Sequence, residues 1–212
     1  MMLYVVIRAM NAGLDTNQAC CLSPRCQRNH GAKCQVNVWS NMYRHHRWSN
    51  LVMIDFLVGL TELQLRLEVP GTYGSSIDTI RHLVSSDADY VRIIPDTPEV
   101  PQCAQDGPFG GWDELRTVAD TAGTVLTAYV DGLSDDMFFI DVDDGEEFTL
   151  AKSMLLSQII HHATEHRSQI RTTLSTHGII PPEISLWAWR ESEEGQAVLA
   201  ELATLANLAS EV

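Results

Sequence analysis

The stretch IIHHATEHRSQIRTTLSTHG, residues 159–178, combines helical periodicity with four of the chain's eight histidines. Its apolar residues recur at three- and four-residue intervals, which is the period of an amphipathic helix with one face in a core. The pattern extends back to about Ala151. Gly178, followed by the pair Pro181 and Pro182, marks the expected end of the helix. The segment therefore predicts a long helix over about residues 151–177.

Two of the histidines interrupt the apolar face of this helix. The aliphatic positions stop at Ile159 and resume at Ile170, and His162 and His166 occupy the same face between them. They are four residues apart, so one ring lies a turn above the other. Burying two imidazoles without partners is costly. Either they are hydrogen-bonded core residues or they bind a metal together.

The other two histidines have simpler interpretations. His161 lies about 100° around the helix from His162 and has Glu165 four residues further on, which is typical of a solvated pair. His177 lies at the helix end, where a cationic side chain interacts favourably with the helix dipole.

The remainder of the chain predicts an all-α protein. Helical periodicity recurs over residues 43–60, 75–94 and 112–133, and two β-prone pieces flank Asp144-Gly145, which is typical of a hairpin. The expected fold is a four-helix bundle with a small β-hairpin before the last bundle helix. We place this bundle at residues 42–192 and a C-terminal helix or tail at 193–212.

Residues 1–41 differ in composition from the rest of the chain. They have a net charge of +3, whereas the whole chain has −14, and they hold four of its five cysteines. We interpret the segment as an unstructured leader, or as the product of a start codon placed upstream of Met42. A zinc module is less favoured, because its Cys and His residues fit no common zinc spacing: Cys21, Cys26, His30 and Cys34.

The charge and composition restrict the partners. An acidic chain of 212 residues lacks the basic face that nucleic acids and anionic membranes require. No apolar run is long enough for a membrane helix. The remaining thiol, Cys103, offers no disulfide framework, so we expect a reducing cytoplasm.

A metal site needs more ligands than one helix supplies here. The HxxxH pair gives two, and Ala163 stands where a metalloprotease motif has its glutamate. A catalytic site requires a third protein ligand and an open position. His45, His46 and His82 are the candidates, and periodicity does not choose between them.

Several motifs resemble those of the DinB/YfiT-like superfamily. The resemblance covers roughly residues 42–190, and its motifs follow one another in the family's order. They are RWSNL (47–51), GTYGSSIDTIRHLV (71–84), HATEHRSQI (162–170) and, after a proline pair, the aromatic tail PPEISLWAW (181–189).

The resemblance implies a commonly dimeric four-helix bundle with a three-histidine metal site. Carried over by motif, the ligands are His82, His162 and His166, which suit Zn²⁺, Ni²⁺ or Fe²⁺. Asp78 and Gln169 are candidates for supporting the ligands. Arg167 is expected to be a structural ion-pair or interface residue.

The family includes thiol-dependent transferases and isomerases that use mycothiol, bacillithiol or glutathione, and metal-dependent hydrolases. We expect a metal-dependent enzyme acting on a small molecule, with a low-molecular-weight thiol as cofactor. The alternatives are a hydrolase, a non-catalytic metal-binding bundle associated with stress, and a metal-free protein whose histidines are core residues. No catalytic residue is assigned. Tyr73 and Trp48 are expected to pack in the core.

Overall fold

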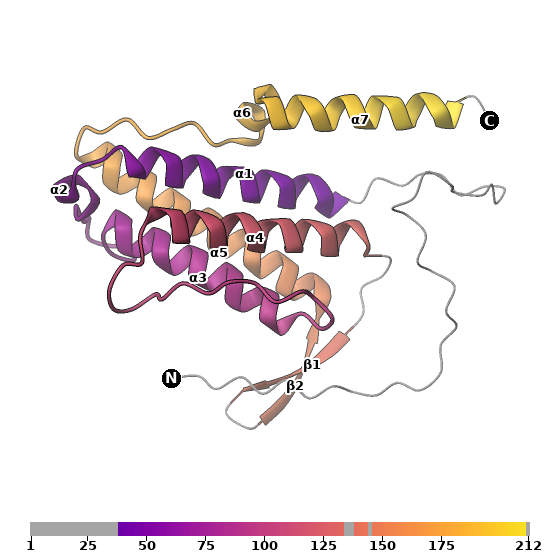
Figure 1. Ribbon diagram of the computed structural model, residues 1–212, viewed down its shortest axis with the longest axis horizontal. Helices are drawn as coiled ribbons and strands as arrows, with labels where there is room; N and C mark the ends of the chain where they lie inside the picture. The colour runs from indigo at the N-terminus through magenta and orange to yellow at the C-terminus, as the bar shows by residue number, and fades with distance from the viewer. Residues whose placement is uncertain (1–37, 134–137, 144–145, 211–212) are drawn as a thin grey trace.

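The computed structural model describes residues 38–133, 138–143 and 146–210 of the chain (Figure 1). Its helices are α1 (Val38–Val58), α2 (Glu62–Leu65), α3 (Ser76–Ile93), α4 (Trp112–Asp131), α5 (Lys152–Thr176), α6 (Leu186–Glu191) and α7 (Glu193–Ser210). One antiparallel pair, β1 (Phe138–Asp143) and β2 (Glu146–Ala151), lies between α4 and α5. The structure is mostly helical, as the sequence predicts. The Asp144-Gly145 turn lies outside the described residues.

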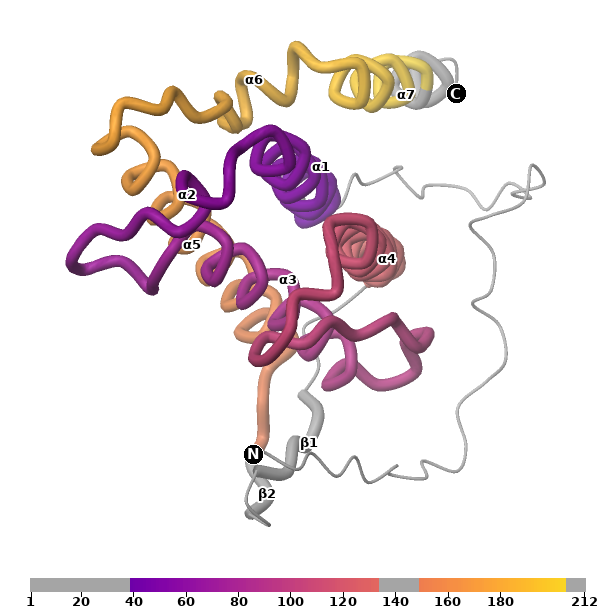
Figure 2. Tube along the Cα trace, turned by 60° about the vertical axis from the view of Figure 1, so that its left-hand side comes forward, coloured from indigo at the N-terminus to yellow at the C-terminus, as the bar shows by residue number. Residues whose placement is uncertain are grey.

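Four long helices form the body of the protein. Helix α1 packs on α4 and α5, and α3 packs on the same two helices, so each helix has two principal neighbours (Figure 2). Helix α6 contacts α1, and α7 continues outside the body alongside α6. This arrangement brings α3 and α5 together, and these are the helices that carry His82 and the HxxxH pair.

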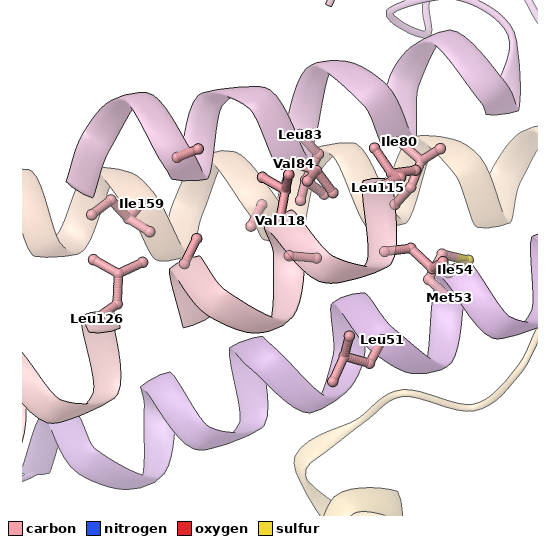
Figure 3. Packing of buried hydrophobic residues seen from close by; sticks show 14 of the residues in the cluster. Leu51, Met53, Ile54, Ile80, Leu83, Val84, Leu115, Val118, Leu126 and Ile159 are labelled. Atoms are coloured by element: carbon pink, nitrogen blue, oxygen red, sulfur yellow. The ribbon is translucent and has the colours of Figure 1, made fainter. Parts of the chain in front are cut away.

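The core is aliphatic and lies between these helices. Figure 3 shows Ile54 of α1, Leu83 of α3, Leu126 of α4 and Ile159 of α5 converging in it, and all four are fully buried. Burying one such side chain contributes about 1.5–3 kcal/mol relative to leaving it exposed. The core therefore holds the facing surfaces of α3 and α5 in a fixed relation.

The two site helices have defined ends, and the end of α5 follows the expected glycine signal. Ser75 is the N-cap of α3, and its hydroxyl accepts a hydrogen bond from the Asp78 backbone N–H. At the end of α5, Gly178 has a φ of +74°. The backbone N–H groups of Gly178 and Ile179 bond back to the carbonyls of Ser175 and Leu174, which is a Schellman motif. A side chain at Gly178 would be strained in this conformation.

The first helix begins earlier than its periodicity suggests. Helix α1 starts at Val38, inside the segment 1–41 that we expected to be a leader. Ser40 is only 7% exposed, and Trp39 packs against the core. The polar residues Ser40 and Asn41 weaken the apolar pattern of this first turn, so the sequence placed the boundary too late. The Cys and His residues of the weighed zinc module lie outside the described residues.

None of the helices in the described residues is long and apolar enough to cross a lipid bilayer.

Candidate metal centre

Three imidazoles from two helices converge at one point. His82 Nε2 of α3 lies 3.1 Å from His162 Nε2 of α5, and His166 Nε2 lies 3.1 Å from the same atom. The three candidate ligand atoms all lie within 4.8 Å of one another. His166 is buried, and His82 and His162 are partly exposed. The structure thus brings together the three histidines named from the sequence.

The local fold explains how each ring arrives there. His162 and His166 are four residues apart on α5 and so share the face that meets α3. On α3, Ile80, Leu83 and Val84 enter the core. His82 lies beside this buried face, at the seam with α5. Its position on the helix alone was ambiguous, and the packing of α3 on α5 resolves it.

Hydrogen bonding alone does not satisfy this cluster. A neutral imidazole nitrogen either carries one hydrogen or offers one lone pair. His162 Nε2 has two nitrogen neighbours at 3.1 Å, so a single hydrogen bond leaves one of these contacts uncompensated. Two nitrogens bound tetrahedrally to one zinc ion at about 2.0–2.1 Å lie about 3.3–3.4 Å apart. The observed separations are close to that value, so the donor set fits a transition metal.

The electrostatics keep the rings available as ligands. Burial, with smaller contributions from the neighbouring imidazoles of His166 and His82, lowers the pKa of His162 to about 4. Burial also lowers the pKa of His166, although a hydrogen bond to Gln169 opposes this shift. Neutral imidazole is the form that binds metals. At neutral pH these two residues are therefore in the ligand form.

Gln169 orients one of the rings. Its side-chain oxygen accepts a hydrogen bond from His166 Nδ1 at 2.9 Å and another from the backbone N–H of Tyr73 at 3.2 Å. Its side-chain nitrogen lies 3.3 Å from a carboxylate oxygen of Glu165. A hydrogen on Nδ1 of His166 leaves Nε2 with its lone pair directed at the cluster. Gln169, a candidate for supporting a ligand, therefore lies in contact with the ring of His166.

Asp78 was a candidate for supporting a metal ligand, but its carboxylate contacts the start of its own helix. Its carboxylate accepts a hydrogen bond from the Ser75 hydroxyl at 2.5 Å. Nδ1 of His82 and Nδ1 of His162 are buried and have no hydrogen-bond partner among the described residues. Asp78 therefore belongs to the cap of α3, and this contact gives no support for a role beside His82.

Tyr73 covers the cluster, whereas the sequence interpretation placed it in the core. Its side chain is 45% exposed, and its ring stacks on His82 with centroids 4.2 Å apart and an interplanar angle of 15°. It also meets His166 edge-on at 5.1 Å. Gln105 donates a hydrogen bond to the Tyr73 hydroxyl at 2.8 Å, so the 95–111 loop reaches this residue. Trp48, in contrast, packs against the core as expected.

A second polar group lies buried between α1, α3 and α5. His46 Nε2 lies 2.9 Å from an Asp87 carboxylate oxygen, and the Asn50 amide donates to the same oxygen at 2.9 Å. Arg167 donates to Asn50 Oδ1 at 2.6 Å and is only 4% exposed. Burial lowers the pKa of Arg167 to about 10, and the charge of Asp87 opposes that shift. Arg167 was expected to form an ion pair or lie at an interface, and instead it bonds to an amide inside the fold.

The other histidines considered lie apart from the cluster. His45 bonds to the Ile184 carbonyl at 2.8 Å, and His46 belongs to the buried group above. His161 is exposed, and His177 Nδ1 bonds to the Thr173 carbonyl at the end of α5. For the buried group that contains His46, the helical period of α1 indicates that Asn50 lies on a buried face. It does not predict that Asn50 bonds to Arg167 of α5.

The class of protein follows from these features: a helical protein with a three-histidine cluster between two of its helices. The model of the DinB family matches residues 29–197, which is most of the chain, so the chain belongs to the DinB family. This confirms the resemblance seen in the motifs. No curated protein matches the chain.

Proposed function

We propose that this protein is a metal-dependent enzyme of the DinB type, built as a four-helix bundle with a small hairpin, that uses a low-molecular-weight thiol. His82, His162 and His166 would hold a divalent ion of zinc, nickel or iron. The observation that carries the proposal is the convergence of three Nε2 atoms, with two separations of 3.1 Å. Family membership supports it.

The donor set determines the available chemistry. Three neutral imidazoles leave a divalent ion its full charge, and a metal bound this way makes a coordinated thiol or water much more acidic. Around it, the chain supplies orientation and cover. Gln169 keeps the hydrogen of His166 on Nδ1, and Tyr73 shields one side of His82.

The nucleophilic thiol would come from a small molecule. Cys103 is the cysteine within the described residues, and burial raises its pKa to about 11. The thiolate is the reactive form, so Cys103 is a poor nucleophile at neutral pH. An exogenous thiol would lose its proton at the site, and its sulfur would attack an electrophilic small molecule while a leaving group departs or a multiple bond opens. In an isomerisation the new bond to sulfur would break again and release the thiol. We place this activity in a cytoplasmic homodimer.

The first test is metal content. The protein, a His162→Ala/His166→Ala double variant and a His161→Ala variant are purified alike and analysed for transition metals. We expect about one metal per chain, lost in the double variant and kept in His161→Ala, whose ring is exposed on the same helix. An equal metal content in all three proteins would show that His162 and His166 do not bind the metal.

A second measurement addresses the thiol. The Co²⁺-loaded protein is titrated with glutathione, bacillithiol or mycothiol while its visible absorption is followed. A sulfur-to-metal absorption band that saturates with one thiol supports the proposed enzyme. A metal that stays bound while every thiol leaves its spectrum unchanged would instead indicate a hydrolase or a non-catalytic, stress-associated bundle.

A further inference from the structure

A cavity lies on the other side of α5 from the histidine cluster. It has a volume of about 400 Å³ and is bounded by α1, α5 and the start of α6. The segment that joins α5 to α6 passes alongside α1 and closes one wall (Figure 1). This volume is within the range of small-molecule sites, about 300–1,000 Å³.

Helical geometry separates this cavity from the metal site. The α5 residues that line it include Thr164, Arg167 and Arg171. At about 100° per residue, these positions face roughly opposite to His162 and His166. The two sites therefore share a helix without sharing a side chain, and an inference about the cavity does not depend on the proposed function.

The cavity is cationic in an acidic protein. Arg167 and Arg171 line it, and none of the described residues that line it is an aspartate or a glutamate. The chain as a whole has a net charge of −14. A local excess of positive charge in such a chain is the electrostatic signature of an anion site.

Arg167 is a buried guanidinium that has no direct carboxylate partner among the described residues. It contacts Asn50, the ring nitrogen Nδ1 of His46 and the Thr164 hydroxyl, and no carboxylate lies within 4 Å of it among the described residues. These bonds use three of the five N–H groups that a guanidinium carries. Arg167 reaches the buried carboxylate of Asp87 only through Asn50, so an anion in the cavity would give it a directly paired counter-charge.

Arg171 is incompletely paired. One of its terminal nitrogens lies 3.4 Å from a Glu183 carboxylate oxygen, and its Nε is buried without a partner among the described residues. The hydroxyl of Ser168 lies on the same wall of the cavity. Arginine pairs with carboxylates and phosphates through two parallel hydrogen bonds, so Arg171 suits an anionic oxygen group.

The remaining walls are apolar. Met42, Ile160 and Leu186 come from three different segments and line the cavity. They favour a ligand with a hydrocarbon body, and one negative charge costs less to desolvate here than the two charges of a phosphate. The apolar walls and the arginines together describe one amphipathic ligand.

We propose that this cavity binds a small organic carboxylate, with its carboxyl group at Arg167 and Arg171 and its hydrocarbon part against Met42, Ile160 and Leu186.

The test is a titration of the full chain with octanoate, in which calorimetry measures the heat of binding. Octanol and inorganic phosphate are titrated separately, since one lacks the charge and the other lacks the hydrocarbon body. We expect saturable one-to-one binding of octanoate and at least about tenfold weaker binding of the other two, the loss expected for one charge-assisted hydrogen bond. Octanol or phosphate binding as tightly as octanoate would overturn the proposal.

Two variants locate the binding, and both alter side chains that are not fully buried. Arg171→Gln should weaken octanoate binding about tenfold or more. Ser168→Asp should abolish it, because a carboxylate would then lie in the cavity wall. Thr204→Asp adds the same charge to an exposed position of α7 and should leave the affinity unchanged. Octanoate binding that survives both cavity variants would place the ligand elsewhere and overturn the proposal.

Discussion

The side-chain oxygen of Gln169 lies 2.9 Å from Nδ1 of His166. The two residues are three positions apart on α5, so the helix itself holds the amide against the ring. An amide oxygen can only accept, so the hydrogen of His166 resides on Nδ1 and the lone pair on Nε2 faces the other two histidines.

Replacing Gln169 with alanine should therefore weaken metal binding without removing it. Residues that orient a ligand histidine typically contribute about 10- to 100-fold to metal affinity. A competition titration against a chromogenic chelator would measure this change. Gln158→Ala is the matched control, since Gln158 lies on the same helix and its nearest polar partner is Tyr90, at 3.5 Å. Equal affinities in the two variants would show that Gln169 does not orient the ligand.

Tyr73 should control access to the metal. Its ring stacks on His82 while its side chain is 45% exposed. Tyr73→Ala should release metal to a chelator about 2- to 10-fold faster, which corresponds to the energy of one aromatic pair. Tyr73→Phe keeps the ring and loses only the bond to Gln105, so its release rate should match the parent. Faster release from Phe than from Ala would assign the effect to the hydroxyl instead of the ring.

Asn50 should be important for stability because it joins two buried charged groups. It donates to Asp87 and accepts from Arg167. Asn50→Ala leaves both without this partner and should cost about 2–4 kcal/mol in the free energy of unfolding. Chemical denaturation measures the loss. Asn41→Ala, on the same helix but partly exposed, should stay within about 0.5 kcal/mol of the parent.

His45 should make folding sensitive to acid. Burial lowers its pKa from the ordinary value of 6.5, while the hydrogen bond to the Ile184 carbonyl opposes the shift. Below 6.5 the unfolded chain therefore binds a proton that the folded chain resists. Stability falls with pH from about 6.5 down through the lowered pKa of the folded state.

The variant His45→Gln removes this titration and retains an N–H donor for Ile184. The free energy of unfolding, measured across pH 7 to 4, should fall less steeply in the variant than in the parent. His162 and His166 contribute loss of the same sign, so some acid sensitivity should remain. An unchanged slope would show that His45 titrates alike in both states.

Truncation should separate the contribution of the residues before Val38 from that of the first helix. Deleting residues 1–37 should leave the melting temperature unchanged, because α1 begins at Val38. Deleting residues 1–41 should lower it, because Trp39 packs against the core and Ser40 is buried. A thermal melt of the two truncated chains beside the full chain tests both statements. A melting temperature lowered equally by both deletions would place part of the preceding segment in the fold.

Local pattern predicted the elements that depend on near neighbours. The C-terminal motif at Gly178 follows from backbone chemistry within a few residues. The pairing of His162 with His166 follows from the period of the helix, which places residues four apart on one face. Each of these features was visible in the sequence because a single helix determines it.

Other features depend on how the helices pack. The periodicity of α3 left His82 ambiguous, and only a family motif suggested it. Its approach to His162, 80 positions away, requires α3 and α5 to lie together. Tyr73 looked like a core residue because aromatic side chains usually are. Its loop instead places the ring over His82, with a hydrogen bond from Gln105.

The sequence by itself thus determined the long helices, the C-terminal end of α5 and the two-histidine face of α5, although it placed the start of α1 too late. The tertiary structure decided which third histidine joins that face, which residues cover it, and that Arg167 lies between a buried amide and a cationic cavity. The physical reason is range. Helical period and capping act over a few residues, whereas a site shared between helices exists only after the aliphatic core has fixed their packing.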